Sequence, residues 1–295
     1  MSASAEERRA LPQLHLCVLL WGFTAILGKL ITLSATALVI WRMLLVTGIL
    51  LLMPRAWRGL RALPRRSRFI FGGIGCVIAL HWLAFYGSIK LANASVAVAC
   101  LALGAIFAAL VEPLLTRRNH ERSELLLGLI AIPGVVLLVG GVPLEMRLGI
   151  VAGVIAAFLS AVFGSLNKRY LGSGEPATIT LLQMGAGTLF IMLAGLAALG
   201  PAEALPIPSA SDLAWLLILA GICTVLPFMM WLHALRHVSA FTTQIALNLE
   251  PVYAIVIAAL WFREYTELTP QFYLGVAIIL LTVFLQPRLR RWLSR

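Results

Sequence analysis

The sequence predicts an all-α membrane protein with ten transmembrane helices, arranged as two five-helix repeats of opposite orientation with both termini in the cytoplasm. Of its 295 residues, 61% are hydrophobic and only 12% are charged, and apolar runs follow one another along almost the whole chain. A helix needs ~20 mostly apolar residues to cross a bilayer, and these runs are long enough. The runs are continuous rather than alternating, which excludes a membrane β-barrel.

Ten apolar segments, separated by polar residues, glycine or proline, define the predicted helices. They are residues 14–31, 36–53, 68–90, 94–115, 124–141, 146–170, 176–199, 211–236, 239–262 and 268–287. The charged N-terminus before the first segment resembles a signal peptide only superficially, because the apolar run continues without a small-residue cleavage site. We therefore expect an uncleaved first span.

The basic residues set the expected orientation. With the N-terminus in the cytoplasm, most of the 23 Lys and Arg residues fall in cytoplasmic segments, as the positive-inside rule requires. The net charge of +11 could suggest a nucleic-acid partner, but these charges lie in short segments between apolar runs. The expected partners are the lipid bilayer, with some attraction to anionic lipid, and a small-molecule substrate; no nucleic acid is expected. The expected location is the inner (plasma) membrane, crossed many times.

A weak internal repeat supports the division into two halves. A shift of 147 residues places residues 86–138 on 233–285 without a gap, and Gly128 then coincides with Gly275. Because five spans is an odd number, the second repeat must be inverted. Inverted repeats are typical of alternating-access transporters, whose substrate site lies near the midplane. We expect residues 1–141 and 146–287 to form the two repeats of one integrated membrane domain.

Several motifs resemble those of the drug/metabolite transporter superfamily. They are Trp21-Gly22 followed by Lys29, Arg42 in the second span, and the ninth-span pattern Leu249-Glu250-Pro251-Val252 with Glu264 beyond it. The chain is most similar to the EamA-type ten-helix exporters, which include bacterial amino-acid and aromatic amino-acid exporters. The resemblance covers essentially the whole chain. It implies a central cavity lined mainly by spans 1, 3, 4, 6, 8 and 9. The fourth span departs from the family pattern, since Leu103-Gly104 replaces Leu-x-Pro and Arg117 stands where the motif has glutamate.

The ninth span carries an acid and a helix breaker at membrane depth. Glu250 lies ~17 Å into its span at 1.5 Å per residue, which is close to the middle of the bilayer. A carboxylate there costs ~2.5–3.5 kcal/mol and normally faces a cavity or a partner. Glu250 either binds a cationic group or a proton, or it is a structural carboxylate that satisfies backbone groups freed by the helix break at Pro251. Gln244 and Asn248 share a helix face nearby and are further candidates for substrate binding or coupling.

Aromatic and imidazole groups at midplane extend the candidate site. His81 and Trp82 lie midway along the third span, Tyr86 lies one turn beyond them, and Trp21 lies on the first span. These groups would suit a planar or amphipathic solute. The alternative is ordinary packing between helices.

Two basic side chains are expected to reach the membrane surface. Arg42 lies ~9 Å into the second span, so we expect it to extend to the outer face rather than pair with an acid. Lys29 stands at a span end and is expected to do the same.

Small residues follow one face of the sixth span at every fourth position: Gly149, Gly153, Ala157, Ala161 and Ser165. Such a stripe allows close helix packing inside the bundle, or alternatively forms a dimer seam. We expect a monomer and leave a dimer open. Gly72, Gly73 and Gly75 of the third span are expected to act in packing or as a hinge.

The sequence has no catalytic motif of a soluble enzyme, no nucleotide-binding loop and no metal-binding pattern. We therefore expect no enzyme activity, no cofactor and no metal. The predicted function is a secondary transporter that exports small metabolites, above all amino acids or related amphipathic solutes, by alternating access. The alternatives are a carrier of the same fold for drugs, sugars, organic acids or nucleosides, a membrane-embedded lipid-processing enzyme, and a membrane adaptor or sensor without transport.

Overall fold

The computed structural model describes residues 5–116, 122–170, 172, 174–237 and 249–293, and these residues form helices joined by turns, with no strand among them. The first half contains α1 (Ala5–Leu30), α2 (Ala35–Leu51), α3 (Pro54–Arg58), α4 (Arg65–Leu91), α5 (Ala94–Leu101), α6 (Gly104–Thr116) and α7 (Arg122–Gly140). The second contains α8 (Arg147–Tyr170), α9 (Pro176–Leu199), α10 (Pro201–Ala204), α11 (Ala210–Ala220), α12 (Leu226–His237), α14 (Glu250–Phe262) and α15 (Pro270–Leu293). The 3₁₀ turns Leu144–Met146 and Glu264–Thr266 and the π-helical turn Gly221–Val225 lie between helices.

Within these described residues, six helical segments are long and apolar enough to cross a membrane. They are Pro12–Leu30, Arg65–Leu91, Ala94–Thr116, Leu144–Tyr170, Pro176–Leu199 and Ala210–Ala234. Four shorter apolar helices, Ala35–Leu51, Ile130–Gly140, Glu250–Phe262 and Pro270–Thr282, lie in the other predicted spans. The prediction of an all-helical membrane protein is confirmed.

Local sequence signals account for many helix beginnings. Proline occupies the first turn of α3, α9 and α10, where its missing N–H costs no helical hydrogen bond. Ser34, Asn93 and Ser209 precede α2, α5 and α11, and each side chain accepts a hydrogen bond from a first-turn backbone N–H. These caps satisfy N–H groups that would otherwise lack partners at the helix ends.

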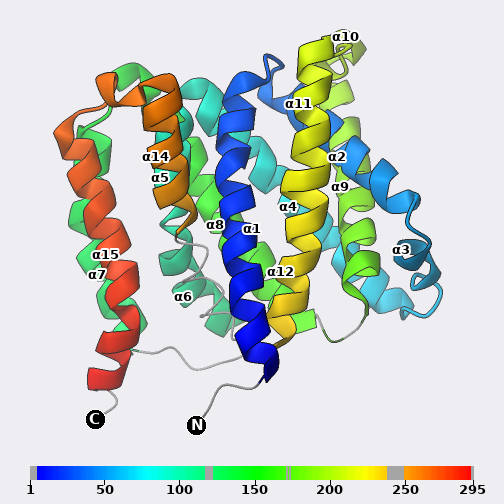
Figure 1. The fold of residues 1–295 in the computed structure, drawn as a ribbon, viewed down its shortest axis with the longest axis horizontal. Helices are drawn as coiled ribbons and strands as arrows, with labels where there is room; N and C mark the ends of the chain where they lie inside the picture. The colour runs from blue at the N-terminus through cyan, green and yellow to red at the C-terminus, as the bar shows by residue number, and fades with distance from the viewer. Residues whose placement is uncertain (1–4, 117–121, 171, 173, 238–248, 294–295) are drawn as a thin grey trace.

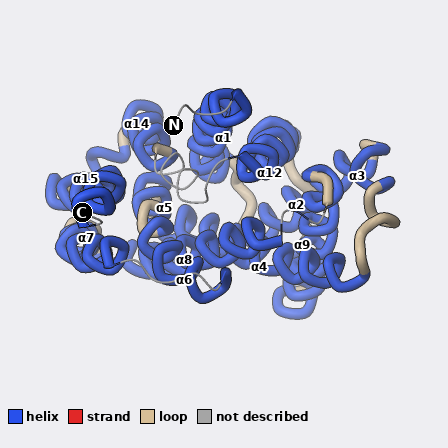
Figure 2. Tube along the Cα trace, turned by 90° about the horizontal axis from the view of Figure 1, so that it is seen from below, coloured by secondary structure: helices blue, strands red, loops and turns tan. Residues whose placement is uncertain are grey.

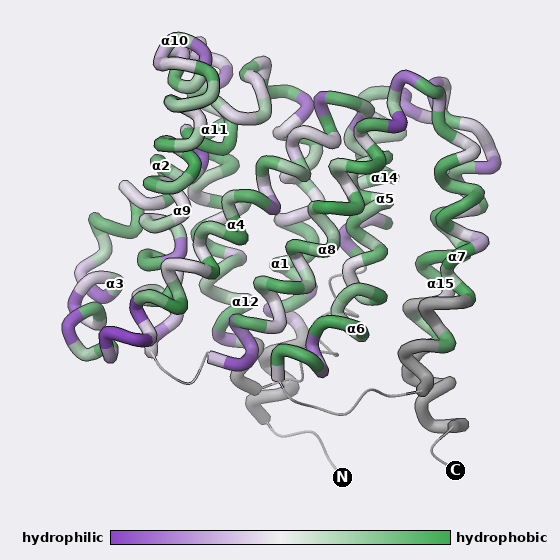
Figure 3. Tube along the Cα trace, turned by 180° about the vertical axis from the view of Figure 1, so that it is seen from behind, coloured by the Kyte–Doolittle hydropathy of each residue, from purple (hydrophilic) through white to green (hydrophobic). Residues whose placement is uncertain are grey.

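The helices stand side by side in an elongated array. α7 and α15 form one end of it, and α2, α3 and α9 form the other (Figures 1 and 2). The beginning of α1 and the end of α15 lie at the same lower edge in Figure 1. Figure 3 shows hydrophobic residues along the helices and hydrophilic residues gathered toward the two edges, as a bilayer requires.

The contacts between helices repeat when the chain is shifted by 147 residues. That shift brings α4 onto the α11–α12 segment, α2 onto α9 and most of α1 onto α8. Accordingly, α4 packs on α8 as α12 packs on α1, and α6 packs on α8 as α14 packs on α1. α7 packs on α15, and α2 packs on α9, so each of these two pairs joins an element to its own counterpart. Two similar halves facing each other would produce this pattern.

Three predicted spans are not uniform helices. The fourth is interrupted by a turn at Ala102 and Leu103, although a continuous helix was expected. The ninth is described from Leu249, and its helix α14 begins at Glu250 with Pro251 in the first turn. Because the shift places Leu103 on Glu250, the turn in the fourth span and the beginning of α14 occupy corresponding positions. The eighth span contains the π-helical turn.

Small residues allow the closest helix crossings. A Cβ added at Gly149 would lie 2.5 Å from Cβ of Ala92, and one added at Gly153 would lie 2.7 Å from Cβ of Cys100. The stripe on α8 therefore packs against α4 and α5 inside the bundle. Gly75 is tighter still, because an added Cβ would lie 2.0 Å from the backbone oxygen of Gln183 on α9.

Replacing Gly75 by alanine is expected to lower the free energy of unfolding by about 1–3 kcal/mol, because the α4–α9 crossing has no room for a methyl group. Gly73 is the matched control, since an added Cβ there meets no atom within 4 Å. Thermal unfolding of both purified variants measures the difference. Equal melting temperatures for the two variants would contradict this account of the crossing.

Candidate functional site

A cavity of about 90 Å³ lies among α1, α2, α4, α5, α8, α12 and α14. Its aromatic wall consists of Trp21, Trp82, Phe85, Phe163, Phe228 and Trp231, and its polar side chains are Thr24, Arg42, His81, Ser160 and Glu250. The family resemblance implied a cavity lined by spans 1, 3, 4, 6, 8 and 9. The observed cavity is lined by helices of these spans and also by the second span. A mostly aromatic wall with a few convergent polar groups is typical of small-molecule sites.

Arg42 of α2 is buried at this cavity, with 2% of its surface exposed. Its Nε and Nη2 donate to Oγ1 of Thr224 at 3.0 and 2.8 Å, and its Nη1 donates to the hydroxyl of Tyr86 at 2.7 Å. The guanidinium also lies 3.7 Å from the ring centroid of Trp82. The expectation that Arg42 extends to the membrane surface is therefore wrong, because two hydroxyl groups and an aromatic face stabilise the cation inside the bundle.

The π-helical turn presents Thr224 to Arg42. The hydroxyl of Thr224 donates to the carbonyl of Leu219 at 2.6 Å, so its oxygen lone pairs are left to accept from the guanidinium. Pro227 follows shortly after and cannot donate to the carbonyl of Cys223, which lies within the turn. Sequence reasoning missed Thr224, and Pro227 is the signal that could have indicated an irregular helix there. Turns of this kind are frequent at functional sites.

Glu250 is half-buried and faces the same cavity from the beginning of α14. No hydrogen bond or ion pair to its carboxylate is found within the described residues. The positive end of the α14 dipole favours a carboxylate at this position. Within the described residues, the carboxylate of Glu250 thus accepts no hydrogen bond from a backbone N–H. Its oxygens are available to a molecule bound in the cavity.

The predicted residues His81, Trp82 and Trp21 also line the cavity. Nδ1 of His81 is 2.8 Å from the carbonyl oxygen of Ala156, and its ring centroid lies 5.2 Å from that of Phe163. The ring of Trp21 meets that of Trp231 edge-on at 6.0 Å. These three side chains therefore belong both to the helix packing and to the cavity wall.

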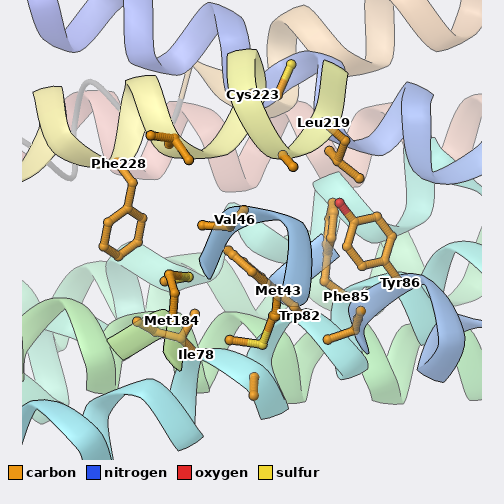
Figure 4. Packing of buried hydrophobic residues seen from close by; sticks show 14 of the residues in the cluster. Met43, Val46, Ile78, Trp82, Phe85, Tyr86, Met184, Leu219, Cys223 and Phe228 are labelled. Atoms are coloured by element: carbon orange, nitrogen blue, oxygen red, sulfur yellow. The ribbon is translucent and has the colours of Figure 1, made fainter. Parts of the chain in front are cut away.

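Tyr86 lies behind the cavity wall rather than in it. It is fully buried, and its hydroxyl accepts from Arg42. Figure 4 shows its ring beside that of Phe85 and close to Leu219. Tyr86 thus contacts a cavity residue and holds it in place. Gln244 and Asn248, the other predicted candidates, lie outside the described residues.

A second polar cluster ties α1, α5 and the turn after α14 together. Glu264 is fully buried, and one of its oxygens accepts from Nζ of Lys29 at 2.7 Å. Its carboxylate also accepts from the backbone N–H groups of Ala94 and Ser95 at 3.2 and 2.8 Å. Lys29 was expected to extend to the membrane surface. Its side chain remains 29% exposed, and its ammonium pairs with this buried carboxylate, a partner that was not predicted. We call these four residues the Glu264 cluster.

Comparisons with known proteins show the same division of the chain into two repeats. The EamA-like transporter family matches residues 10–140 and again residues 147–286. The chain is 22% identical over 289 residues to the uncharacterized transporter YyaM of Bacillus subtilis (strain 168), with 92% of each protein covered. A solved structure titled "Crystal structure of protein" aligns with a TM-score of 0.68 at 16% identity and covers 98% of this chain and 99% of its own. That likeness shows that the fold is shared.

Proposed function

Because the chain belongs to the EamA-like transporter family, we propose that it exports amino acids or related amphipathic metabolites across the inner (plasma) membrane by alternating access. The observation that carries this proposal is one cavity with a cation, Arg42, and an anion, Glu250, inside an aromatic wall. Such a cavity is complementary to a zwitterion with an apolar side chain.

The polar groups match the two ends of an amino acid. A guanidinium has five N–H donors, and Arg42 uses three of them on Thr224 and Tyr86. The other two can bind a carboxylate, for which arginine has suitable planar geometry. The carboxylate of Glu250 can accept from an ammonium group, and the surrounding rings can contact the side chain. A sugar would bring no opposite charge to either side chain, and an organic acid would bring none to Glu250.

The proposed topology is two inverted repeats, residues 1–141 and 146–287, which cross the membrane ten times in one integrated domain. Its support is the exchange of helix contacts under the 147-residue shift and the common edge shared by the beginning of α1 and the end of α15. Both ends would then face the cytoplasm, together with the arginines of α3. The small-residue stripe of α8 is used inside the bundle, which favours a monomer.

The cavity requires a conformational change to accept this substrate. Its volume of about 90 Å³ is well below the roughly 300–1,000 Å³ of small-molecule sites. The helices around it must therefore separate when a metabolite binds. Alternating access supplies such a movement, because each half of the transporter tilts against the other.

Counterflow in proteoliposomes tests the proposed function. Vesicles that contain the purified protein and an unlabelled amino acid are expected to accumulate the same labelled amino acid, while protein-free vesicles do not. A panel of amino acids, sugars, organic acids and nucleosides identifies the substrate class. Counterflow of organic acids or sugars without any amino acid would contradict the proposed cargo, and absence of all counterflow would contradict the transport proposal.

Glu250→Gln is expected to lower amino-acid counterflow by about tenfold or more, because a hydrogen bond to a charged group contributes about 1.5–3 kcal/mol. The variant is also expected to lose its preference for the free amino acid over the N-acetyl derivative, which has no ammonium group. Glu145→Gln removes an exposed carboxylate and is the matched control. Unchanged discrimination between the two compounds in Glu250→Gln would show that Glu250 does not contact the amino group.

A further inference from the structure

A second cavity, of about 660 Å³, is a groove between α2, α4 and α9. It is separate from the central cavity, since the two have no lining residue in common. Leu51 and Phe69 at the groove are 55% and 71% exposed, so the groove opens to the outside of the bundle. In a membrane this opening faces the lipid.

The walls of the groove are apolar, and glycines form part of them. Leu181 and Leu182 of α9 line it together with Gly72 and Gly73 of α4. A Cβ added at Gly73 would meet no atom within 4 Å, so the glycine leaves open space in the groove. Open, apolar space that faces lipid suits a hydrocarbon chain.

The end of the groove is strongly basic. Arg65 and Arg68 line it, and they belong to a segment, residues 55–68, with six arginines and no acidic residue. Nε of Arg68 donates to the carbonyl of Leu63 at 2.9 Å, and the guanidinium of Arg65 lies 5.9 Å from the ring centroid of Phe69. Neither arginine has an acidic partner among the described residues. Both therefore retain N–H donors for an anion.

The neighbouring helix α3 places this basic end at the depth of lipid headgroups. Trp57 of α3 is 45% exposed and stands between Arg55 and Arg58. Exposed tryptophan beside basic residues is typical of the membrane–water interface. Figure 3 shows the hydrophilic residues around α3 at the edge of the molecule, next to hydrophobic stretches of α2 and α9.

We propose that this groove binds an anionic phospholipid of the surrounding leaflet, with the phosphate on Arg65 and Arg68 and one acyl chain along Gly72 and Gly73. Basic pockets between transmembrane helices bind anionic headgroups in this way. The charge selects an acidic headgroup over a zwitterionic one, and the apolar walls select a lipid over a free anion. Because the groove is built by α2, α4 and α9, the bound lipid holds these three helices together.

Native mass spectrometry and thermal unfolding of the delipidated full-length protein test the site with phosphatidylglycerol and phosphatidylcholine of identical acyl chains. Phosphatidylglycerol is expected to remain bound at higher collision energy and to raise the melting temperature, whereas phosphatidylcholine and inorganic phosphate are not. Equal stabilisation by phosphatidylcholine would overturn headgroup recognition. Equal stabilisation by inorganic phosphate would overturn the assignment to a lipid.

Two kinds of variant separate the groove from general surface charge. Arg65→Gln/Arg68→Gln is expected to weaken phosphatidylglycerol binding by about tenfold or more, as the loss of two charge-assisted contacts implies. Arg55→Gln/Arg58→Gln removes the same charge outside the groove and is expected to bind like the wild type. If both double variants bound phosphatidylglycerol equally weakly, the binding would be due to general surface charge and the proposed site would be overturned.

Gly73→Phe keeps every charge and fills the groove, so it is expected to weaken phosphatidylglycerol binding as well. Unchanged binding in this variant would show that no acyl chain occupies the groove.

Arg65→Gln alone leaves the Arg68–Leu63 hydrogen bond intact, and it is also expected to weaken phosphatidylglycerol binding. This single variant keeps the test decisive if the double variant fails to fold.

Discussion

Arg42→Gln is expected to reduce amino-acid counterflow by about a hundredfold or more, because a substrate carboxylate would lose a charge-assisted bidentate contact. Among the described residues that line the cavity, the variant also leaves Glu250 with no Lys or Arg beside it. Arg42→Lys retains the charge but cannot reach both Thr224 and Tyr86 with a planar group, so partial activity is expected. Counterflow measured at equal amounts of reconstituted protein gives the comparison.

An amino-acid methyl ester separates a binding role of Arg42 from a structural one. The ester has no carboxylate, so the wild type is expected to prefer the free amino acid, and Arg42→Gln is expected to lose that preference. Arg147→Gln removes an exposed arginine at the beginning of α8 and serves as the control. If Arg42→Gln transports less of both compounds and keeps the wild-type preference, the residue supports the helices and does not bind the carboxylate.

Glu264→Ala is expected to cost about 2–6 kcal/mol of stability, because two buried backbone N–H groups would lose their acceptor at about 1–3 kcal/mol each. The substitution leaves the ammonium of Lys29 without its partner and the N–H groups of Ala94 and Ser95 without an acceptor. The apparent melting temperature of the purified protein measures this loss. Glu203→Ala, at an exposed position on α10, is the control.

A double-mutant cycle identifies the contribution of the ion pair itself. Lys29→Met removes the cation and leaves Glu264 on the two backbone N–H groups. If the pair is coupled, Lys29→Met/Glu264→Ala is expected to be more stable than the sum of the two single losses predicts. Strict additivity would contradict a direct interaction between the two side chains.

The helical segments could be predicted from sequence because the signals for them are local. Continuous apolar runs and flanking prolines placed most of the observed helix ends to within a few residues, although α1 begins at Ala5 rather than at residue 14 and α15 ends at Leu293 rather than at residue 287. The turn at Ala102 and Leu103 carries no such signal beyond the weak helix former Gly104, so the fourth span was predicted as one helix. The π-helical turn was missed for a similar reason, because Pro227 alone does not show how the preceding turn rearranges.

The candidate site was predicted only in part, since its contacts join distant segments. Glu250, His81, Trp82 and Trp21 were singled out because polar and aromatic groups at membrane depth are unusual. Arg42 was misplaced because its distance from the membrane surface alone favours extension to that surface. The hydroxyl groups that keep it inside come from other helices, and Thr224 is 182 residues away along the chain. The partner of Lys29 was missed for the same reason, because Glu264 lies 235 residues away along the chain.

We infer that the Glu264 cluster serves as a pivot for helices that line the central cavity. α5 ends at Leu101 and α14 begins at Glu250, so each of these short helices has a cavity residue at one end and lies close to the cluster at the other. On α1, Trp21 lies ~12 Å from Lys29 at 1.5 Å per residue. We expect the ends that Glu264 joins to stay together while the three helices tilt, so that their far ends move most. Such a tilt would open the cavity toward the edge where α1 begins.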